Sequence, residues 1–495
     1  MKTIHTETPS PLTKHQQKIF NKIVEQIDTK VPSLLKSSRI EDYLLSLTGA
    51  AGTGKTFLTV QIAKYLAQKQ QELTYPKNID YNFVITAPTH KAVGVIAETL
   101  AHAGLEASCK TIHSFLGIKP FVDYETGEER YKIDKTKKSK DATSILMVDE
   151  SSMIGSELYE FILEAIEEGR VQMVLFIGDP YQLLPVNDDV NHVYKLKQQF
   201  NLTEVVRQAK DSYIISIATK LRERIQRQDF MDLKQFFAEC GQTYQELKLF
   251  HNKTDFLNAF YEGEKWHEAD KVLAAYKNKN VDAFNREIRS VYWQQQNINI
   301  PSTLLPGDRL RFKEAYSIRD VTLYYNGQVV ILEEAEKQYH DLLQIEFWEC
   351  KAVHMPQQQI FRVVDPDSIK VFNDKLTLLA KKARESKYPD NKNYWKAFFE
   401  VRDMFAQVQY VYASTIHKLQ GSTYEDVFID LFSMVDNRYM SQDEKYRLAY
   451  VAVTRASRDV KLFMPGFNGP NHAEGLPDMY KEFDVIDSML EDLTL

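Results

Sequence analysis

The stretch Gly49-Ala50-Ala51-Gly52-Thr53-Gly54-Lys55-Thr56 matches the phosphate-loop pattern G-x-x-x-x-G-K-[ST] at each fixed position. It follows the apolar run 43–47 and precedes residues 57–66, whose apolar positions recur at helical spacing. The order of strand, glycine loop and helix disfavours a chance glycine-rich turn. Glycines let backbone N–H groups turn toward phosphate oxygens, and the helix N-terminus adds the positive end of its dipole. Residues 49–56 are therefore expected to bind a nucleotide, with Lys55 at the terminal phosphates and the Thr56 hydroxyl on Mg²⁺.

Length and composition predict a globular protein of two to four domains, since 495 residues with 43% hydrophobic content can bury several cores. The 62 basic and 69 acidic residues give a net charge of −7, which argues against a uniformly basic coat but allows a basic groove. The 3 cysteines lie far apart, so neither a disulfide framework nor a zinc site is predicted and a reducing cytosol is expected. The N-terminus lacks an apolar signal core, and no apolar run approaches the ~20 residues that span a bilayer, so no membrane association is expected.

The pattern along the chain predicts two α/β domains with two insertions. Short apolar runs typical of buried parallel strands occur at 44–48, 83–86, 144–148 and 173–177, and again at 271–276, 408–413 and 426–431. Between the two sets, residues 307–312 and 326–332 are typical of antiparallel strands joined through an Asn-Gly turn, and residues 374–387 and 394–405 are typical of helices. This insertion is expected to be a small β-barrel with a helical arm. The alternating segment 119–141 predicts an exposed hairpin.

Polar residues that follow two of the predicted strands are candidates for catalysis. Asp149 and Glu150 would stand at the carboxyl edge of the sheet, where Asp149 is expected to hold Mg²⁺ and Glu150 to orient the attacking water. Gln182 follows the next strand, and its neutral amide suits a sensor of the γ-phosphate. Arg207 and Arg455 are candidate planar cations for the γ-phosphate, provided that the second domain closes over the nucleotide.

The motifs taken together resemble those of superfamily 1 DNA helicases of the RecD-like branch (superfamily 1B), nearest in motif order to the Dda group of T-even-type bacteriophages. Residues 12–16 resemble the glutamine motif that reads adenine, 49–56 motif I, 86–92 motif Ia, 111–115 the DNA-contacting motif after it, and 149–150 motif II. Residues 178–182 resemble motif III, Arg207 the motif IV arginine, 414–423 motif V and 450–455 motif VI. The combination covers nearly the whole chain and is far more specific than any one motif.

The resemblance implies an α/β fold of two RecA-like P-loop NTPase domains, with an inserted β-hairpin acting as a wedge and an inserted SH3-like barrel carrying a helical tower. The implied ranges are 1–200 for the first domain with the hairpin at 118–141, 201–300 and 406–495 for the second, and 301–405 for the barrel and tower. It also implies an ATP- and Mg²⁺-dependent DNA helicase that moves 5′-to-3′ on single-stranded DNA, with a role in phage DNA replication and recombination. The implied adenine contact is Gln16, and Gly421 joins residues 49–56 around the nucleotide. The implied DNA contacts are Pro88, Thr89, His90, Thr111, His113, Pro120, Phe121, Tyr131, Thr415 and His417.

Several alternatives stay open at this point. The two motif histidines, His113 and His417, could fill a core role, and the junction aromatic could be Phe121, Tyr124 or Tyr131. The basic run 130–140 suits duplex phosphates or a solvated loop equally. A phosphate-loop kinase would leave motifs V and VI unexplained, whereas a DNA-stimulated ATPase or translocase that unwinds only with partners stays a rival. The expected partners are single-stranded DNA, strand junctions, and single-stranded-DNA-binding, replisome or recombination proteins; a monomer in the cytoplasm, that of the host for a phage protein, is expected.

Overall fold

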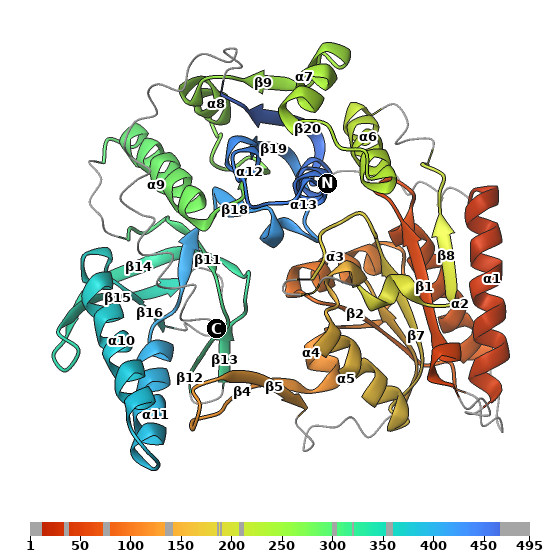
Figure 1. Ribbon diagram of the computed structural model, residues 1–495, viewed down its shortest axis with the longest axis horizontal. Coiled ribbons are helices and arrows are strands. Elements are labelled where there is room, and N and C mark those ends of the chain that lie inside the picture. Colours follow the sequence, from red (N-terminus) through yellow and green to blue (C-terminus); the bar gives the residue numbers. More distant parts are fainter. Residues whose placement is uncertain are drawn as a thin grey trace.

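The computed structural model describes residues 12–33, 39–72, 80–133, 142–185, 188, 191–206, 212–298, 304–318, 321–352 and 360–465. Figure 1 shows two α/β domains, with an inserted sheet and two long helices set to one side of them. No helix within these described ranges combines the length and the apolar composition needed to cross a membrane.

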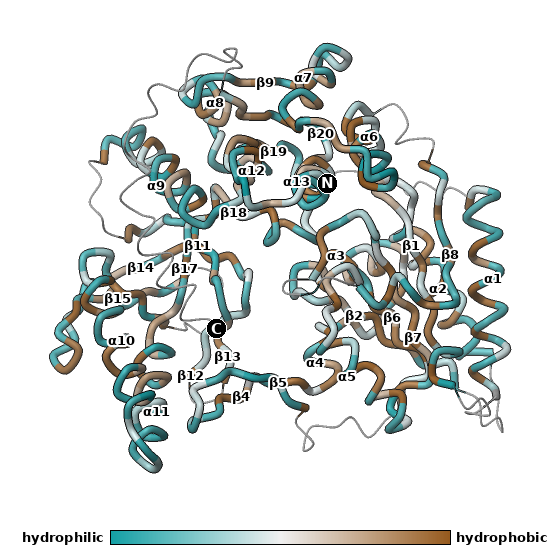
Figure 2. The backbone as a smooth tube through the Cα atoms, viewed as in Figure 1, coloured by the Kyte–Doolittle hydropathy of each residue, from teal (hydrophilic) through white to brown (hydrophobic). Residues whose placement is uncertain are grey.

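The first α/β domain is a parallel sheet of six strands, ordered β3 (Ser108–Thr111), β2 (Phe83–Ala87), β6 (Thr143–Val148), β7 (Val171–Gly178), β1 (Leu44–Gly49) and β8 (Gln198–Leu202). Strands β1 and β6 are buried along their whole length, as expected for parallel strands covered on both faces. One core cluster packs α1 (Lys14–Lys30), α2 (Lys55–Glu72) and α3 (His90–His102) on the sheet, and another packs α4 (Ile112–Leu116) and α5 (Ser156–Glu167). Figure 2 shows the hydrophobic colour concentrated along these strands.

The second α/β domain is a parallel sheet of five strands, ordered β18 (Ala413–Thr415), β10 (Lys271–Ala275), β19 (Tyr424–Asp430), β20 (Ala456–Phe463) and β9 (Lys248–Phe250). Its larger core cluster includes residues of α6 (Tyr213–Arg227), α7 (Leu233–Thr243), α12 (Phe432–Val435) and α13 (Gln442–Val453). A second cluster includes residues of α8 (Lys253–Phe260) and α9 (Asn278–Gln295). Both domains therefore have the layered α/β arrangement of a RecA-like unit.

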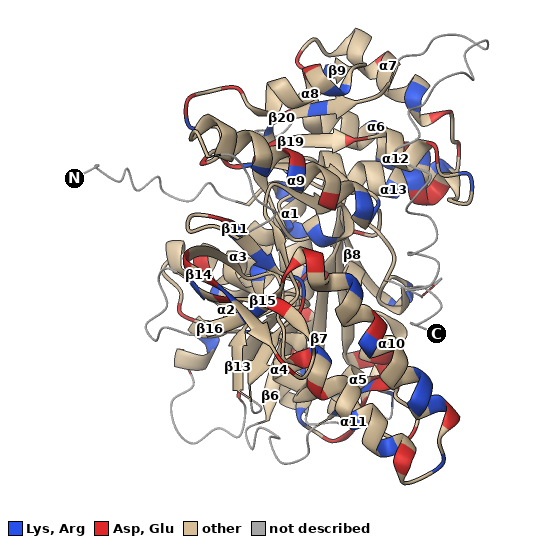
Figure 3. Ribbon diagram, turned by 90° about the vertical axis from the view of Figure 1, so that its left-hand side faces the viewer, with Lys and Arg blue, Asp and Glu red and all other residues tan. Residues whose placement is uncertain are grey.

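The insertion contains an antiparallel sheet, here called the inserted sheet, in the order β16 (Ile360–Val364), β15 (Ile345–Ala352), β14 (Val329–His340), β11 (Arg309–Phe312) and β17 (Val408–Tyr410). A two-stranded sheet, β12 (Tyr316–Ile318) and β13 (Val321–Tyr324), packs its aromatic Tyr324 on Phe312 of β11. The helices α10 (Ile369–Glu385) and α11 (Asp390–Asp403) form an arm in which acidic and basic residues are interspersed (Figure 3).

The structure corrects two sequence expectations for this insertion. The run 408–413 is two strands instead of one, because β17 pairs with β11 of the inserted sheet while β18 pairs with β10 of the second domain. The expected pairing of β11 with β14 is present, but the Asn-Gly turn does not join them directly, because the β12–β13 pair lies between them in the chain. Two domain boundaries also differ from those expected. The first domain, expected to end at residue 200, continues through β8 to Leu202, and the insertion, expected to end at residue 405, continues through β17 to Tyr410.

The segment 118–133 forms a two-stranded antiparallel hairpin of β4 (Ile118–Val122) and β5 (Glu129–Ile133). Figure 1 shows this hairpin extending from the first domain toward the arm. The remainder of the predicted hairpin segment, including the lysines at 135–140, lies outside the described residues.

Candidate active site and nucleic-acid interface

The phosphate loop connects the end of β1 to the start of α2, as its sequence predicts. Gly52 and Gly54 have φ values of 77° and 80°, in the left-handed region that glycine adopts without strain. Within the loop, the Thr53 hydroxyl donates to the Ala50 carbonyl at 2.8 Å, and the Lys55 ammonium donates to the Gly49 carbonyl at 2.6 Å. These hydrogen bonds close the loop on itself at the N-terminus of α2.

Gln16 packs directly against this loop. The Thr13 side chain and Gln16 form a capping box at the start of α1. The Gln16 side-chain amide donates to the Thr53 carbonyl at 3.1 Å, and Gln16 is buried. A Cβ atom at Gly54 would lie 2.5 Å from Gln16 Nε2, so the loop backbone approaches this side chain closely.

Asp149 and Glu150 follow β6 at the carboxyl edge of the first sheet. Burial raises the pKa of Asp149 to about 7, and the charge of Glu150 adds to the rise. Glu150 has a φ of 51°, an uncommon left-handed conformation for a residue with a side chain and a form of backbone strain that clusters at functional sites. Gly421 of the second domain faces this residue, because a Cβ added there would lie 3.8 Å from Glu150 Cγ.

The oxygen donors present at this edge fit a magnesium ion. A carboxylate at Asp149 and an exposed hydroxyl at Thr56 are the kinds of ligand that Mg²⁺ prefers, and Lys55 acts electrostatically on the Asp149 carboxyl. Among the described residues, no group of three or more His, Cys, Asp or Glu side chains gathers as a metal cluster. A Mg²⁺ ion held by Asp149 and Thr56 would take its remaining ligands from phosphate oxygens and water, as Mg²⁺ commonly does in nucleotide sites.

The other candidate catalytic residues lie on both sides of the boundary between the domains. The Gln182 side chain is buried and accepts a hydrogen bond from the Ser152 hydroxyl at 3.4 Å. Arg455 is also buried, and its guanidinium donates to the carbonyls of Val451 and Ser422, each at 3.2 Å. Arg207 lies outside the described residues.

A tyrosine that was not singled out from the sequence connects the two domains. The Tyr450 hydroxyl on α13 accepts a hydrogen bond from the Ala51 N–H at 3.0 Å and donates one to the Asp179 carboxylate at 2.6 Å. Burial and the Asp179 charge hold the pKa of Tyr450 well above its usual value, so the hydroxyl keeps its proton. Arg447, one turn earlier on α13, donates to the carbonyls of Pro180 and Gln182 at 2.8 and 2.9 Å. We call this set of contacts the domain seam.

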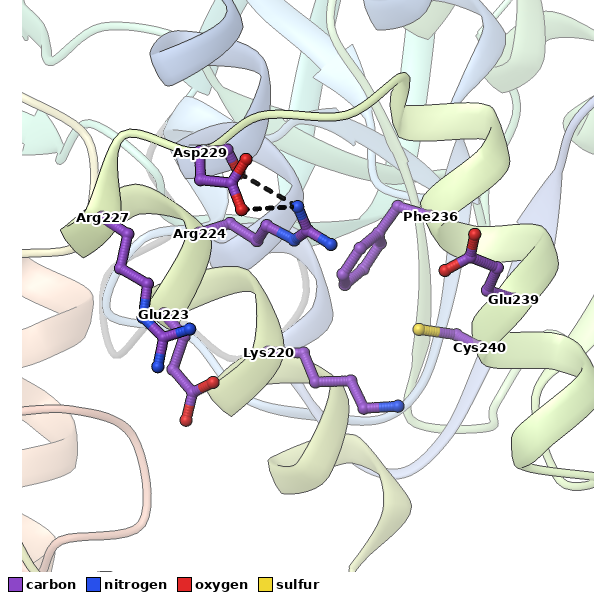
Figure 4. A pocket seen from close by; sticks show the side chains of 8 residues that line it. All are labelled: Lys220, Glu223, Arg224, Arg227, Asp229, Phe236, Glu239 and Cys240. Carbon is purple, nitrogen blue, oxygen red and sulfur yellow. Dashed lines mark hydrogen bonds and ion pairs between the residues drawn. The ribbon is translucent and has the colours of Figure 1, made fainter.

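Two cavities lie beside α6, one next to the phosphate loop and the other next to α7. One, of about 410 Å³, is lined by residues of the phosphate-loop strand, the segment after β7, the end of β8 and α6, including Gly49, Ala50, Tyr181, Asn201 and Arg222. The other, of about 290 Å³, lies between α6 and α7, and Figure 4 shows three basic and three acidic side chains around it, with Arg224 bonded to Asp229. Only the first cavity touches the phosphate loop.

The expected DNA contacts of motif Ia and of the motif after it lie at helix starts in the first domain. The hydroxyls of Thr89 and Thr111 accept hydrogen bonds from the Ala92 and Ser114 N–H groups and so cap α3 and α4. Pro88 is half-buried directly before this first cap. The His90 ring lies against Tyr325, which precedes β14, with ring centroids 4.3 Å apart and planes tilted by 36°. Motif Ia therefore touches the insertion.

The remaining expected DNA contacts lie in different surroundings. The ring centroids of His113 and Tyr131 are 5.8 Å apart, and those of His417 and Tyr276 are 6.1 Å apart. Burial lowers the pKa of both histidines, so both are neutral at pH 7. Thr415 is buried at the end of β18.

The hairpin presents aromatic side chains on its strands and uses its tip for packing. Phe121 and Tyr131 are 41% and 50% exposed, and the Lys132 ammonium lies 3.7 Å from the centroid of the Phe121 ring. Tyr124, the third candidate, packs edge-on against Phe399 of the arm. The Pro120 side chain lies outside the described residues.

The tip of the hairpin is fixed to the arm. A Cβ atom at Gly127 would lie 2.3 Å from the Trp395 ring, so the turn backbone is in close contact with this indole. Arg402 of α11 bonds Glu129 at 2.8 Å. The hairpin therefore joins the first domain to the helical part of the insertion.

Comparison with known proteins gives two family matches. Residues 36–188 match an AAA domain, and residues 410–463 match a UvrD-like helicase C-terminal domain. The chain is 26% identical, over 91% of its length and 98% of the relative, to the ATP-dependent DNA helicase dda of Enterobacteria phage T4. It is 22% identical to the ATP-dependent DNA helicase Pif1 of Campylobacter jejuni, over 83% of its length and 86% of that protein. A solved structure of Bacteroides Pif1 bound to single-stranded DNA aligns with 93% of each chain at 17% identity and a TM-score of 0.46.

Proposed function

We infer that the chain is an ATP-dependent DNA helicase of the RecD-like branch of superfamily 1, because the family matches and the full-length relatives confirm the resemblance that its motifs carry. We propose further that it moves 5′-to-3′ on single-stranded DNA and separates the duplex ahead of it. Its place would be phage DNA replication and recombination in the host cytoplasm, with single-stranded-DNA-binding or replisome proteins as partners.

The domain seam is the observation that carries this proposal. The phosphate loop and Asp179 belong to the first domain, and both bond the same Tyr450 hydroxyl of the second domain. A nucleotide at this seam would contact both domains, so its hydrolysis would change how they sit together. A simple phosphate-loop kinase has no use for this second half.

In the proposed reaction, Glu150 orients water for in-line attack on the γ-phosphate, and Gln182 senses that phosphate. Lys55, Arg455 and, by resemblance, Arg207 would neutralise the charge that develops on it. Mg²⁺, held by Thr56 and Asp149, would supply further charge neutralisation. The backbone of residues 49–56 would bind the phosphates, with Gln16 at the base and Gly421 at the closing side.

For the DNA, we propose that motif residues of both domains hold one strand while the hairpin meets the junction. The strand contacts would be those named from the motifs, Pro88, Thr89, His90, Thr111, His113, Thr415 and His417. Phe121 and Tyr131 are favoured over Tyr124 as junction aromatics, because Tyr124 is engaged with the arm. The inserted sheet and arm would serve as the SH3-like barrel and tower of the family.

Strand displacement with ATP and Mg²⁺ on duplexes with a 5′ or a 3′ single-stranded tail tests this function. We expect unwinding from the 5′ tail and none with Lys55→Ala, which removes the ammonium at the phosphates. Unwinding only from the 3′ tail would contradict the polarity. DNA-stimulated ATP turnover without unwinding from either tail would favour the rival translocase that needs partners.

A further inference from the structure

Two basic side chains, Lys91 and Arg311, act on Tyr424 at a point where three parts of the fold meet. Lys91 comes from the first turn of α3, Arg311 from β11 of the inserted sheet, and Tyr424 from the start of β19 in the second domain. The Lys91 ammonium donates to the Tyr424 hydroxyl at 3.0 Å and lies 4.5 Å from the ring centroid. Arg311 acts on the same hydroxyl. Lys418 is close enough to Arg311 and Lys313 for both of their charges to act on it, and with these two lysines we call the set the Tyr424 cluster.

The cluster carries positive charge that nearby acids do not cancel. Within the described ranges, none of the four cations forms an ion pair with a carboxylate. Partial burial, together with Lys313 and Arg311, lowers the pKa of Lys418, and the acids Glu314 and Asp282 oppose this less strongly. Although burial raises the pKa of Tyr424, Arg311 and Lys91 outweigh it and bring the pKa below its usual value. Cations held together in this way favour an anion between them.

We propose that the Tyr424 cluster is a seat for one phosphodiester group of the translocating strand, held at once by both α/β domains and the inserted sheet. This inference rests on the proposed function. The planar Arg311 guanidinium and the Lys91 ammonium supply donors suited to phosphate oxygens, and the Tyr424 hydroxyl supplies one more. His90, the residue next to Lys91, contacts Tyr325 ring to ring, and this aromatic pair offers a surface for a neighbouring base.

The seat is connected to the candidate catalytic arginine through the backbone. The Tyr424 N–H donates to the Arg455 carbonyl at 2.9 Å, and Tyr424 pairs in register with Ala456. Ser422, two residues before Tyr424, accepts from the Arg455 guanidinium. A phosphate bound at the seat would therefore contact the start of β19, whose neighbouring residues hold Arg455 in place.

The test measures binding of a labelled oligothymidine to the full-length chain between 50 and 200 mM salt. Arg311→Gln should reduce the slope of log affinity against log salt by about 0.7, the value for one lost phosphate contact on a single strand. Relative to the original chain, its deficit should then be about 2.6-fold larger at 50 mM than at 200 mM salt. Tyr424→Phe should weaken binding with little change of slope, since it removes a neutral donor.

Lys351→Gln is the matched control, because Lys351 lies on the inserted sheet but is paired with Glu334. It should leave both affinity and slope unchanged. An Arg311→Gln slope equal to that of the original chain, or an equal loss in Lys351→Gln, overturns the seat. In both cases unwinding by the original chain would leave the proposed function standing, whereas an original chain that neither binds nor unwinds DNA overturns the function and the seat together.

Discussion

Removing the Tyr450 hydroxyl should uncouple the two domains without unfolding either. The hydroxyl makes two bonds across the domain seam, one to a buried carboxylate at 2.6 Å and one to a loop N–H at 3.0 Å. A hydrogen bond to a charged group contributes about 1.5–3 kcal/mol and a neutral one about 1 kcal/mol. Asp179 keeps a bond from the Tyr181 N–H in the variant, so we take the lower end, about 2.5 kcal/mol.

We expect that free energy to be lost only while the two domains are in contact, because both bonds cross the domain seam. At about 1.36 kcal/mol per factor of ten, Tyr450→Phe should lower ATP turnover at saturating ATP and DNA by about 70-fold. Nucleotide affinity should change much less, since the phosphate loop belongs wholly to the first domain. Steady-state turnover, nucleotide binding and thermal melting of the same preparation separate these effects.

Tyr446→Phe is the matched control, because Tyr446 lies one turn earlier on α13 and its hydroxyl donates to the Met231 carbonyl within the second domain. It removes a buried hydroxyl from the same helix but no contact across the seam. The reasoning fails if Tyr450→Phe turns over within about threefold of the original chain, or if Tyr446→Phe loses as much, since a 2.5 kcal/mol change must exceed threefold.

Other parts of the site give further expectations. Glu150→Gln should bind nucleotide but turn over about 10²- to 10⁴-fold more slowly, the usual contribution of a positioned base, so a normal steady-state rate would refute its role with water. Arg455→Ala should lose about 10³- to 10⁵-fold in single-turnover rate with little change in affinity, which is the usual contribution of an arginine finger; an unchanged rate would exclude that role for Arg455. Burial and the Glu150 charge raise the pKa of Asp149, so if Asp149 holds Mg²⁺ as proposed, a proton competes with the ion increasingly as the pH falls; the Mg²⁺ concentration for half-maximal turnover should therefore rise as the pH is lowered through about 7, and a value independent of pH would refute that role. Trp395→Ala should cost the hairpin tip about 3 kcal/mol of packing and reduce unwinding more than DNA-stimulated turnover, and equal losses in both assays would argue against a separate role for the tip.

Features set by local pattern could be predicted from the sequence. The phosphate loop has its strand before it and its helix after it, and Asp149 stands at the end of a buried strand, because apolar runs and glycine positions encode these elements directly. The run 408–413 has uniform β character, so its pattern does not reveal that the chain changes sheets after Tyr410.

Contacts between distant segments could not be predicted in the same way. Tyr450 and Asp179 are 271 residues apart, and their bond depends on how two separately folded domains pack. The sequence does show a tyrosine on the helix that precedes Arg455. It does not show that this tyrosine bonds Asp179. The residues of the Tyr424 cluster likewise come from the first domain, the inserted sheet and the second domain. Their positions in the sequence do not reveal that these three parts meet there.

The attachment of the hairpin at both ends has a mechanical consequence. One end continues into the first domain, and the other lies on Trp395 and is tied by Arg402 to α11. A beam supported at both ends bends far less under the same force than one fixed at a single end. If a duplex pushes back on the exposed strands of the hairpin, the force is shared between the ATP-binding domain and the insertion, so the stiffness of the arm itself would set how much opposing force the motor can withstand before it slips.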